Sequence, residues 1–140
     1  MRFQKILLPV DLSAKHGPAL EVAAQLASRD AGEVILLHVI ELIPGLEVEE
    51  EKHFYGRLEK LAAAHLEKLG EILKPKKVRH RAQIILGNRG AETVRFAREN
   101  GIDLIVVTSP PVDPDHLAAG WASLSYKIGL AATCPVLLVK

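Results

Sequence analysis

The chain has 140 residues, of which 49% are hydrophobic and 25% are charged, and its formal net charge at pH 7 is +1. This length suits a single domain spanning residues 1–140, and the hydrophobic content is sufficient for a sizeable core. The lack of a basic or acidic excess argues against nucleic acid and anionic lipid as partners. No run of about 18 apolar residues occurs, so we expect no membrane span.

The N-terminus and the cysteine content predict a cytoplasmic protein. The first apolar segment is short and is interrupted by Pro9 and Asp11, which is unlike a secretory signal. The single cysteine, Cys134, cannot form an internal disulfide, in agreement with a reducing compartment. Because Pro135 and an apolar run follow it, a buried structural thiol is favoured over a reactive one.

Five short apolar segments alternate with amphipathic segments. Three of the five are nearly continuously apolar, as expected for parallel strands that helices cover on both faces. The predicted strands are residues 5–11, 33–41, 78–86, 103–109 and 134–140.

Four helices are predicted between these strands. Glycines at 32 and 101 end the first and third helices, and lysines after the second suit the negative end of its dipole. The predicted helices run from about residue 13 or 18 to 28, from 47 to 73, from 91 to 100, and from between 120 and 123 to 132.

This alternation predicts an α/β fold with a doubly wound, five-stranded parallel sheet. We expect the strand order 3-2-1-4-5, with helices on both faces. In that order the chain reverses direction between the first and fourth strands, and a crevice opens at their carboxyl ends. Those ends are Val10 and Asp11 on one side and Thr108 and Ser109 on the other.

The segment after the fourth strand, "TSPPVDPDHLAAGWAS" (residues 108–123), is unusual for the edge of a binding crevice. Long loops in compact domains tend to be functional or mobile. Its "DPDH" run, residues 113–116, fits a solvated turn better than a metal site. Without a Gly-x-Ser-x-Gly elbow, a serine hydrolase is disfavoured, and we predict no catalytic residues. His38, within a buried strand, is expected to be a hydrogen-bonded core histidine.

Four segments in chain order resemble the universal stress protein family: "KILLPVDLS", "ILLHV", "GNRGAETVRFARENGIDLIVV" and "SLSYKIGLAATCPVLLVK". The resemblance covers essentially the whole chain, and the ordered set is more specific than any one piece. It implies a fold like that of the adenine nucleotide alpha hydrolases and a role in stress response.

The resemblance also implies an ATP site in part of the family. Members that bind ATP carry Gly-x-x-Gly, then nine residues, then Gly followed by Ser or Thr. In this sequence the three glycine positions hold Ser109, Val112 and Ala122, followed by Ser123. The spacing is kept, but all three glycines are absent.

The residues of this loop argue against phosphate binding. A phosphate cradle needs converging backbone amides and residues that tolerate positive φ. Val112 is β-branched, and Asp113 and Asp115 place negative charge nearby. Trp121 is large enough to fill part of the crevice. Three prolines offer no amide and favour extended backbone: Pro110, Pro111 and Pro114.

The sequence keeps some of the positions that contact the adenosine part of ATP in nucleotide-binding relatives. Asp11 and Val39 match the positions that hold adenine in nucleotide-binding relatives, and Ser123 matches a phosphate-contacting hydroxyl. Asp11 also has a structural interpretation as the cap of the turn into the first helix.

Three functions therefore stay open. The first is a regulatory stress-response module without a cofactor, which acts through a protein partner or an unidentified small ligand. The second is a protein that binds ATP with Mg²⁺, with slow ATPase activity. The third is a crevice that binds a small acidic or metal-bound ligand, which the loop of residues 113–116 would recognise.

The last strand predicts a homodimer. It lies at a sheet edge in the expected order and carries no charge or central proline that would block pairing. A second copy across a two-fold axis is the simplest partner, and the resemblance implies dimerisation through this strand. The predicted interface residues are Val136, Leu137, Leu138 and Val139.

Overall fold

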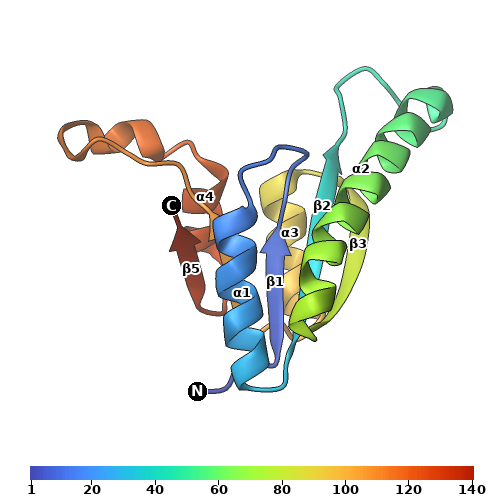
Figure 1. The fold of residues 1–140 in the computed structure, drawn as a ribbon. Helices are drawn as coiled ribbons and strands as arrows, with labels where there is room; N and C mark the ends of the chain where they lie inside the picture. The colour runs from blue at the N-terminus through green and yellow to red at the C-terminus, as the bar shows by residue number, and fades with distance from the viewer.

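The computed structural model describes all residues, 1–140. Its five strands form one parallel sheet in the order β3-β2-β1-β4-β5, which confirms the predicted doubly wound α/β fold (Figure 1). The strands are β1 (Lys5–Pro9), β2 (Glu33–Glu41), β3 (Arg79–Gly87), β4 (Leu104–Thr108) and β5 (Val136–Val139).

The helices are α1 (Gly17–Arg29), α2 (Lys52–Leu73), α3 (Arg89–Glu99) and α4 (Leu124–Ala131), with short 3-10 helices η1 (Lys74–Lys76) and η2 (Pro114–Gly120). The start of α4 agrees with the sequence because Ser123 caps it, accepting a hydrogen bond from the Tyr126 amide. The start of α2 was predicted five residues too early, since residues 48–50 form turns before the helix begins.

The sheet separates two apolar layers. Leu8, Leu36 and Val106 face the layer of α1 and α2. Residues of opposite parity, such as Leu7 and Leu37, pack on the other face with α3 and α4. Because both faces of the central strands are buried, these strands need apolar residues at consecutive positions, which explains their continuous hydrophobicity.

The segment 110–122, here named the arm, leaves the body of the protein after β4. It runs outward beyond β5 before the chain returns to α4 (Figure 1). Its two limbs are close together, since a Cβ built at Gly120 would lie 2.7 Å from Val112 Cγ2. The arm is therefore a packed projection, with η2 at its centre.

β5 forms the predicted edge of the sheet. It pairs only with β4, and its other side has no partner strand. The side chains of Leu137 and Leu138 are 39% and 43% exposed. Cys134, just before this strand, was predicted to be buried and is half-buried, and this partial burial raises the pKa of its thiol. None of the helices combines the length and the apolar character that crossing a membrane would require.

Candidate functional site

A crevice of about 220 Å³ lies at the carboxyl ends of β1 and β4, where the strand order predicts it. Three strands and two helices contribute to the crevice, and its apolar residues come mostly from β1, β2 and β4. The lining residues are Pro9, Val10, Asp11, Lys15, His16, Leu37, Val39, Arg89, Thr93, Val107, Thr108, Pro110, Ser123, Leu124 and Ser125.

Asp11 organises the turn between β1 and α1. Its Oδ1 atom accepts hydrogen bonds from the Ser13 amide at 2.9 Å and the Ser13 hydroxyl at 2.6 Å. Its other oxygen, Oδ2, lies 3.1 Å from Lys15 Nζ. Burial alone would raise the pKa of Asp11, but hydrogen bonds from Ser13, His16 and Lys15 outweigh it and hold the pKa well below the usual range. Asp11 therefore has the structural role that its position in the turn predicts.

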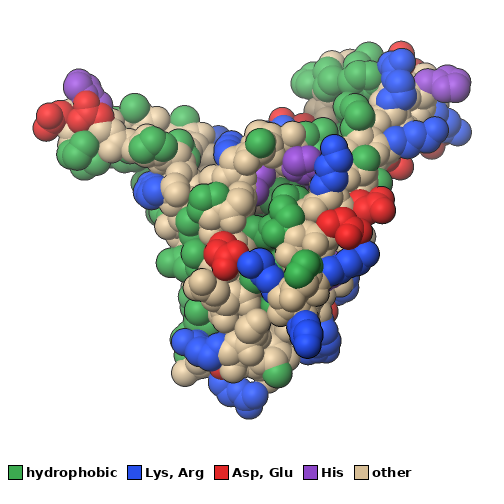
Figure 2. All heavy atoms as spheres, in the orientation of Figure 1, with side chains coloured by type: hydrophobic (Ala, Val, Ile, Leu, Met, Phe, Trp, Pro, Cys, Tyr) green, Lys and Arg blue, Asp and Glu red, His purple; other side chains and the backbone are tan.

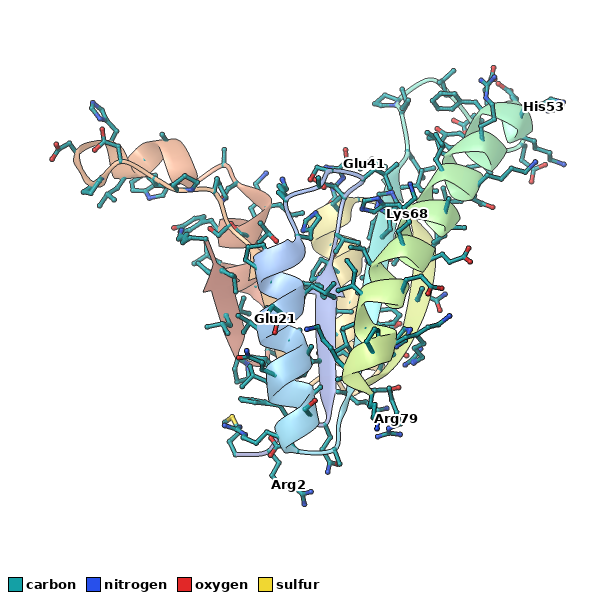
Figure 3. All side chains as sticks on the ribbon, viewed as in Figure 1. Arg2, Glu21, Glu41, His53, Lys68 and Arg79 are labelled. Carbon is teal, nitrogen blue, oxygen red and sulfur yellow. The ribbon has the colours of Figure 1, made fainter.

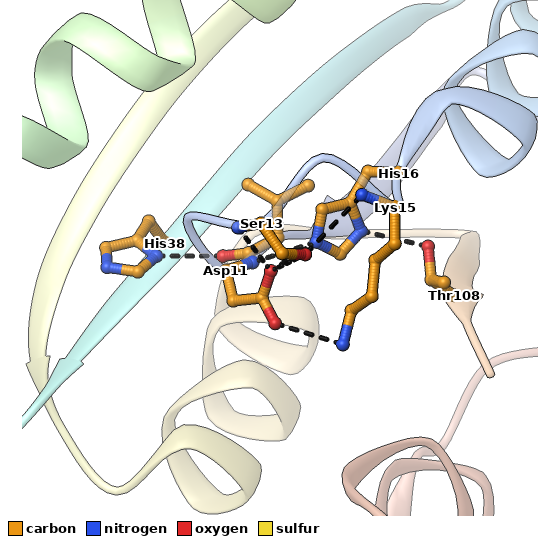
Figure 4. A network of polar contacts seen from close by, with 7 residues as sticks. Asp11, Ser13, Lys15, His16, His38 and Thr108 are labelled. Carbon is orange, nitrogen blue, oxygen red and sulfur yellow. Dashed lines mark hydrogen bonds and ion pairs between the residues drawn. The ribbon is translucent and has the colours of Figure 1, made fainter. Parts of the chain in front are cut away.

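His16 connects the two strands that flank the crevice (Figure 4). Its side chain is buried, with Nε2 2.8 Å from Asp11 Oδ1 and Nδ1 2.9 Å from Thr108 Oγ1. The same Nε2 atom also lies 3.1 Å from the backbone amide of Asp11. The ring therefore ties the β1–α1 turn to the end of β4.

The sequence did not single out His16. The only local signal is its place five residues after the strand-end Asp11, and the contact that fixes its role is with Thr108, 92 positions along the chain. The neighbouring His38 is the hydrogen-bonded core histidine that was predicted: its Nδ1–H donates to the Val10 carbonyl at 2.8 Å (Figure 4).

The opposite wall is a set of serine hydroxyls that bond to one another. Ser125 donates to the buried Ser109 hydroxyl at 3.0 Å, and Lys140 Nζ donates to the same oxygen at 3.1 Å. The Ser123 hydroxyl donates to the Gly120 carbonyl at 2.7 Å. Hydrogen bonds within the protein therefore engage the hydroxyls of Ser109, Ser123 and Ser125.

The backbone amides at both ends of the arm are also occupied. The Ser109 amide donates to the Val139 carbonyl at 2.8 Å, and the Ser123 amide donates to the Gly120 carbonyl at 3.1 Å. These amides bond to the protein itself and do not point freely into the crevice.

The predicted site residues fall into two groups. Asp11, Val39 and Ser123 all line the crevice. Ser109 is buried in the serine cluster, and the other two former glycine positions, Val112 and Ala122, lie in the arm outside the crevice lining.

The expectation that Trp121 fills part of the crevice is wrong. Its side chain is 59% exposed on the arm and is absent from the lining. The physical reason lies in Pro110 and Pro111, which favour extended backbone directly after β4, so the chain runs outward and does not fold back over the strand ends.

Residues 113–116 form the predicted solvated turn. Asp113 Oδ1 accepts the Asp115 amide at 2.9 Å, and Asp113 Oδ2 lies 3.1 Å from His116 Nδ1. The bond from the Asp115 amide, with that from His116, lowers the pKa of Asp113. All four residues are exposed, and no group of three or more potential metal ligands occurs in the structure.

Two cationic side chains stand at the rim of the crevice. Lys15 extends from the turn before α1, and Arg89, at the start of α3, lies 4.0 Å from Glu41 at the end of β2. Figure 3 labels Glu41 at this end of the sheet. The apolar floor, the polar wall at Asp11 and these cations suit a small ligand with an apolar ring and a negative charge.

The model of the universal stress protein family matches residues 2–140. The chain belongs to this family. A relative, the universal stress protein YxiE of Bacillus subtilis, is 29% identical over 150 residues, covering 99% of each chain. The resemblance seen in the sequence is thus confirmed over the whole chain.

Solved structures have the same fold. The protein MJ0577 superimposes with a TM-score of 0.85 and 28% identity, covering 100% of this chain and 97% of that one. A universal stress protein of Archaeoglobus fulgidus, determined in complex with dAMP, superimposes with a TM-score of 0.75 over the full length of both chains. At 19% identity, the second comparison supports the fold alone.

Proposed function

We propose that this universal stress protein is a cytoplasmic, dimeric regulatory protein of the stress response that does not bind ATP through residues 109–123. The observation that carries the proposal is the direction of the arm, which leads two of the three former glycine positions away from the crevice. The protein is proposed to act through a protein partner or an unidentified small ligand, without catalysis. Its lone cysteine fits a reducing compartment.

The loss of amide donors supports this proposal. A triphosphate is held by several backbone N–H groups that converge on its oxygens. Three of the loop residues are prolines, and the amides of Ser109 and Ser123 already bond to carbonyls of the protein. The acidic Asp113 and Asp115 would add repulsion if the arm were to close over a phosphate chain.

Titration calorimetry with ATP and Mg²⁺ tests this proposal directly. We expect no binding at micromolar concentrations. A matched variant restores the loop chemistry with Ser109→Gly, Pro110→Ala, Pro111→Ala, Val112→Gly and Ala122→Gly, and it should gain affinity for ATP. A micromolar dissociation constant for the unmodified protein would overturn the proposal.

The open edge of β5 supports the dimer. The carbonyls of Pro135 and Val139 accept hydrogen bonds from β4. Peptide groups alternate in direction along a strand, so those of Val136 and Leu138 face the unpaired side. An exposed apolar edge of this kind pairs readily with another strand, and a second copy offers an identical one.

Light scattering at micromolar concentration should give twice the chain mass of 15.3 kDa. Leu138→Lys places a charge at the open edge and should shift the protein to the monomer. Leu61→Lys is the matched control, because Leu61 is 59% exposed on α2, far from β5. Equal masses for the two variants would contradict pairing through β5.

A second candidate function is the binding of an adenine nucleotide, with slow ATP hydrolysis. The specific observation in its favour is that Asp11 and Val39 line the crevice together with the cations Lys15 and Arg89. The A. fulgidus relative in complex with dAMP makes a nucleotide a reasonable ligand to test. The triphosphate, however, would lack the loop donors described above.

Heat denaturation of the freshly purified protein, followed by chromatography of the supernatant, distinguishes the two functions. Near-stoichiometric adenine nucleotide would favour the second candidate. Release of inorganic phosphate from added ATP would then test for hydrolysis. If no nucleotide is released and calorimetry with ATP gives no signal, the result favours the regulatory function.

A further inference from the structure

The arm reaches into the space that a second copy would occupy. It starts at the end of β4 and extends past β5, beyond the open edge of the sheet (Figure 1). A subunit paired on β5, as proposed above, would therefore lie directly beside the arm. Any such dimer must either avoid this projection or pack against it.

The arm and its surroundings are rich in exposed apolar side chains. Leu117 is 60% exposed and Trp121 is 59% exposed. On α4, Leu130 is 70% exposed, and on β5 Leu137 and Leu138, whose side chains point to opposite faces of the sheet, are 39% and 43% exposed. Single exposed apolar residues need no explanation, but a series of them along one edge marks a contact surface. Tryptophan in particular is enriched among the residues that dominate binding energy.

Symmetry decides what the arm would meet. When an edge strand pairs with its own copy in one continuous sheet, the two strands run antiparallel across the two-fold axis. The carboxyl end of β5 in one subunit then lies level with the beginning of β5 in the other. Helix α4 ends just before β5 begins, so the C-terminal turn of α4, with the exposed Leu130, lies at that same level.

Charge favours the same arrangement. The arm carries Asp113 and Asp115, and Figure 2 shows acidic atoms at the tip of this projection. The opposite end of the molecule, labelled by Arg2 and Arg79 in Figure 3, is basic. Two carboxylates at this basic end are engaged within their own subunit: Asp30 accepts a hydrogen bond from the Phe3 amide, and Asp103 accepts one from the Gln4 amide.

Antiparallel pairing thus brings the acidic tip of each arm toward the basic end of the other subunit. Complementary charges of this kind guide association and fix the orientation of the partners.

We propose that each arm clasps the second copy, with Trp121 packed against the C-terminal turn of α4, at Leu130 of the partner subunit. This inference rests on the proposed β5 dimer and specifies a second contact within it. The loop that holds phosphate in other members of the family is in this chain an assembly element. The two prolines after β4 serve this role because they keep the arm extended before the partner arrives.

The protein offers a built-in probe, because Trp121 is its only tryptophan. Acrylamide quenching of its fluorescence is measured across a dilution series, with light scattering on the same samples. As the dimer forms, the quenching constant should fall by about twofold or more, since the ring moves from a largely exposed position into an interface core.

Variants test the contact from both sides. Trp121→Ala should weaken dimerisation by about 10- to 100-fold, as removal of a central aromatic anchor does. Leu130→Ala should weaken it less and should leave Trp121 more accessible to acrylamide within the remaining dimer. Leu61→Ala, at an exposed leucine of α2, is the control and should change neither quantity.

The outcomes separate this inference from the dimer on which it rests. A dimer in which Trp121 remains fully quenchable overturns the clasp and leaves β5 pairing intact. A monomer at all concentrations overturns both. Protection of Trp121 in a monomer would mean that the arm folds onto its own subunit, which also contradicts the clasp. A dimer with a protected Trp121 that Trp121→Ala weakens supports both.

Discussion

The two walls of the crevice differ in what holds them. On the side of β1 and α1, Asp11, His16 and Thr108 form a chain of short polar contacts around a buried imidazole. On the side of β4 and α4, the serine hydroxyls bond among themselves, and the intervening residues 110–122 leave the body as an arm. Hydrogen bonds hold both walls, but only on the side of β4 and α4 does the intervening segment leave the crevice as a projection.

The first wall therefore stabilises the fold, while the arm is free to vary in sequence. The first wall joins β1 to β4, so its polar groups contribute to the fold whether or not a ligand binds. The arm contributes few buried groups, so its sequence can change without cost to the core. Substitutions in the first wall should therefore lower the stability of the fold, and substitutions in the arm should not.

Among substitutions of the polar network and the arm, the largest effect is expected for His16→Ala. This change removes a buried ring and leaves Asp11 Oδ1 and Thr108 Oγ1 without one partner each. The loss should lower the free energy of unfolding by about 2–3 kcal/mol, because it empties a buried position and breaks two hydrogen bonds worth about 1 kcal/mol each. Urea denaturation at pH 7, followed by circular dichroism, measures it.

His116→Ala is the matched control in the arm. His116 is exposed and its side chain is hydrogen-bonded to the exposed Asp113, so its removal should change the free energy of unfolding by less than about 0.5 kcal/mol. Equal effects of the two histidine substitutions would contradict the contrast between the walls.

A smaller effect, with a defined pH dependence, is expected for Asp11→Asn. The amide keeps the shape but loses the charge that Lys15 and His16 contact, so we expect about 1–2 kcal/mol of destabilisation at pH 7. The pKa of the Asp11 carboxyl is lower in the folded than in the unfolded chain, where its ordinary value is 3.8. The stability that it adds is therefore complete above that value and decreases as the pH falls below it.

Urea midpoints of the two proteins between pH 7 and pH 2 test this expectation. The difference between them should be constant at neutral pH and should shrink below about pH 4 as Asp11 becomes protonated in the unfolded chain. A difference that stays constant down to pH 2 would show that Asp11 stabilises the turn through shape alone. Asp115→Asn, on the exposed turn of the arm, serves as the control.

The sequence predicted the sheet well because its signals are local. Continuous apolar runs identified the strands, and the glycines at 32 and 101 located the ends of the first and third helices. The alternation with right-handed crossovers limited the topology to a doubly wound sheet, the order 3-2-1-4-5 was chosen within that class, and the crevice followed from the order. The N-terminus of α2 was less predictable, since acidic residues suit the start of a helix but equally allow the turns that occupy residues 48–50.

The candidate site was only partly predictable. Asp11 and Val39 stand at strand positions, so their places in the crevice follow from the sheet. The role of His16 depends on a hydroxyl 92 residues away, which no local pattern encodes. For Trp121, size and hydrophobicity suggested burial, but the direction of the backbone after Pro110 and Pro111 decides where the side chain goes, and it leads outward.

The smallest effect is expected for Leu117→Ala in the arm. Leu117 is 60% exposed, so truncation removes little buried surface and should change the free energy of unfolding by less than about 0.5 kcal/mol. Leu37→Ala, at a crevice residue that is 1% exposed, should cost about 2–5 kcal/mol by the same measurement. Both substitutions are compared in the Leu138→Lys background, where β5 pairing is disfavoured and association does not add to the measured stability. A large loss of unfolding free energy in Leu117→Ala would mean that the arm is part of the folding core. It would contradict the conclusion that the arm serves assembly and adds little to the stability of the fold.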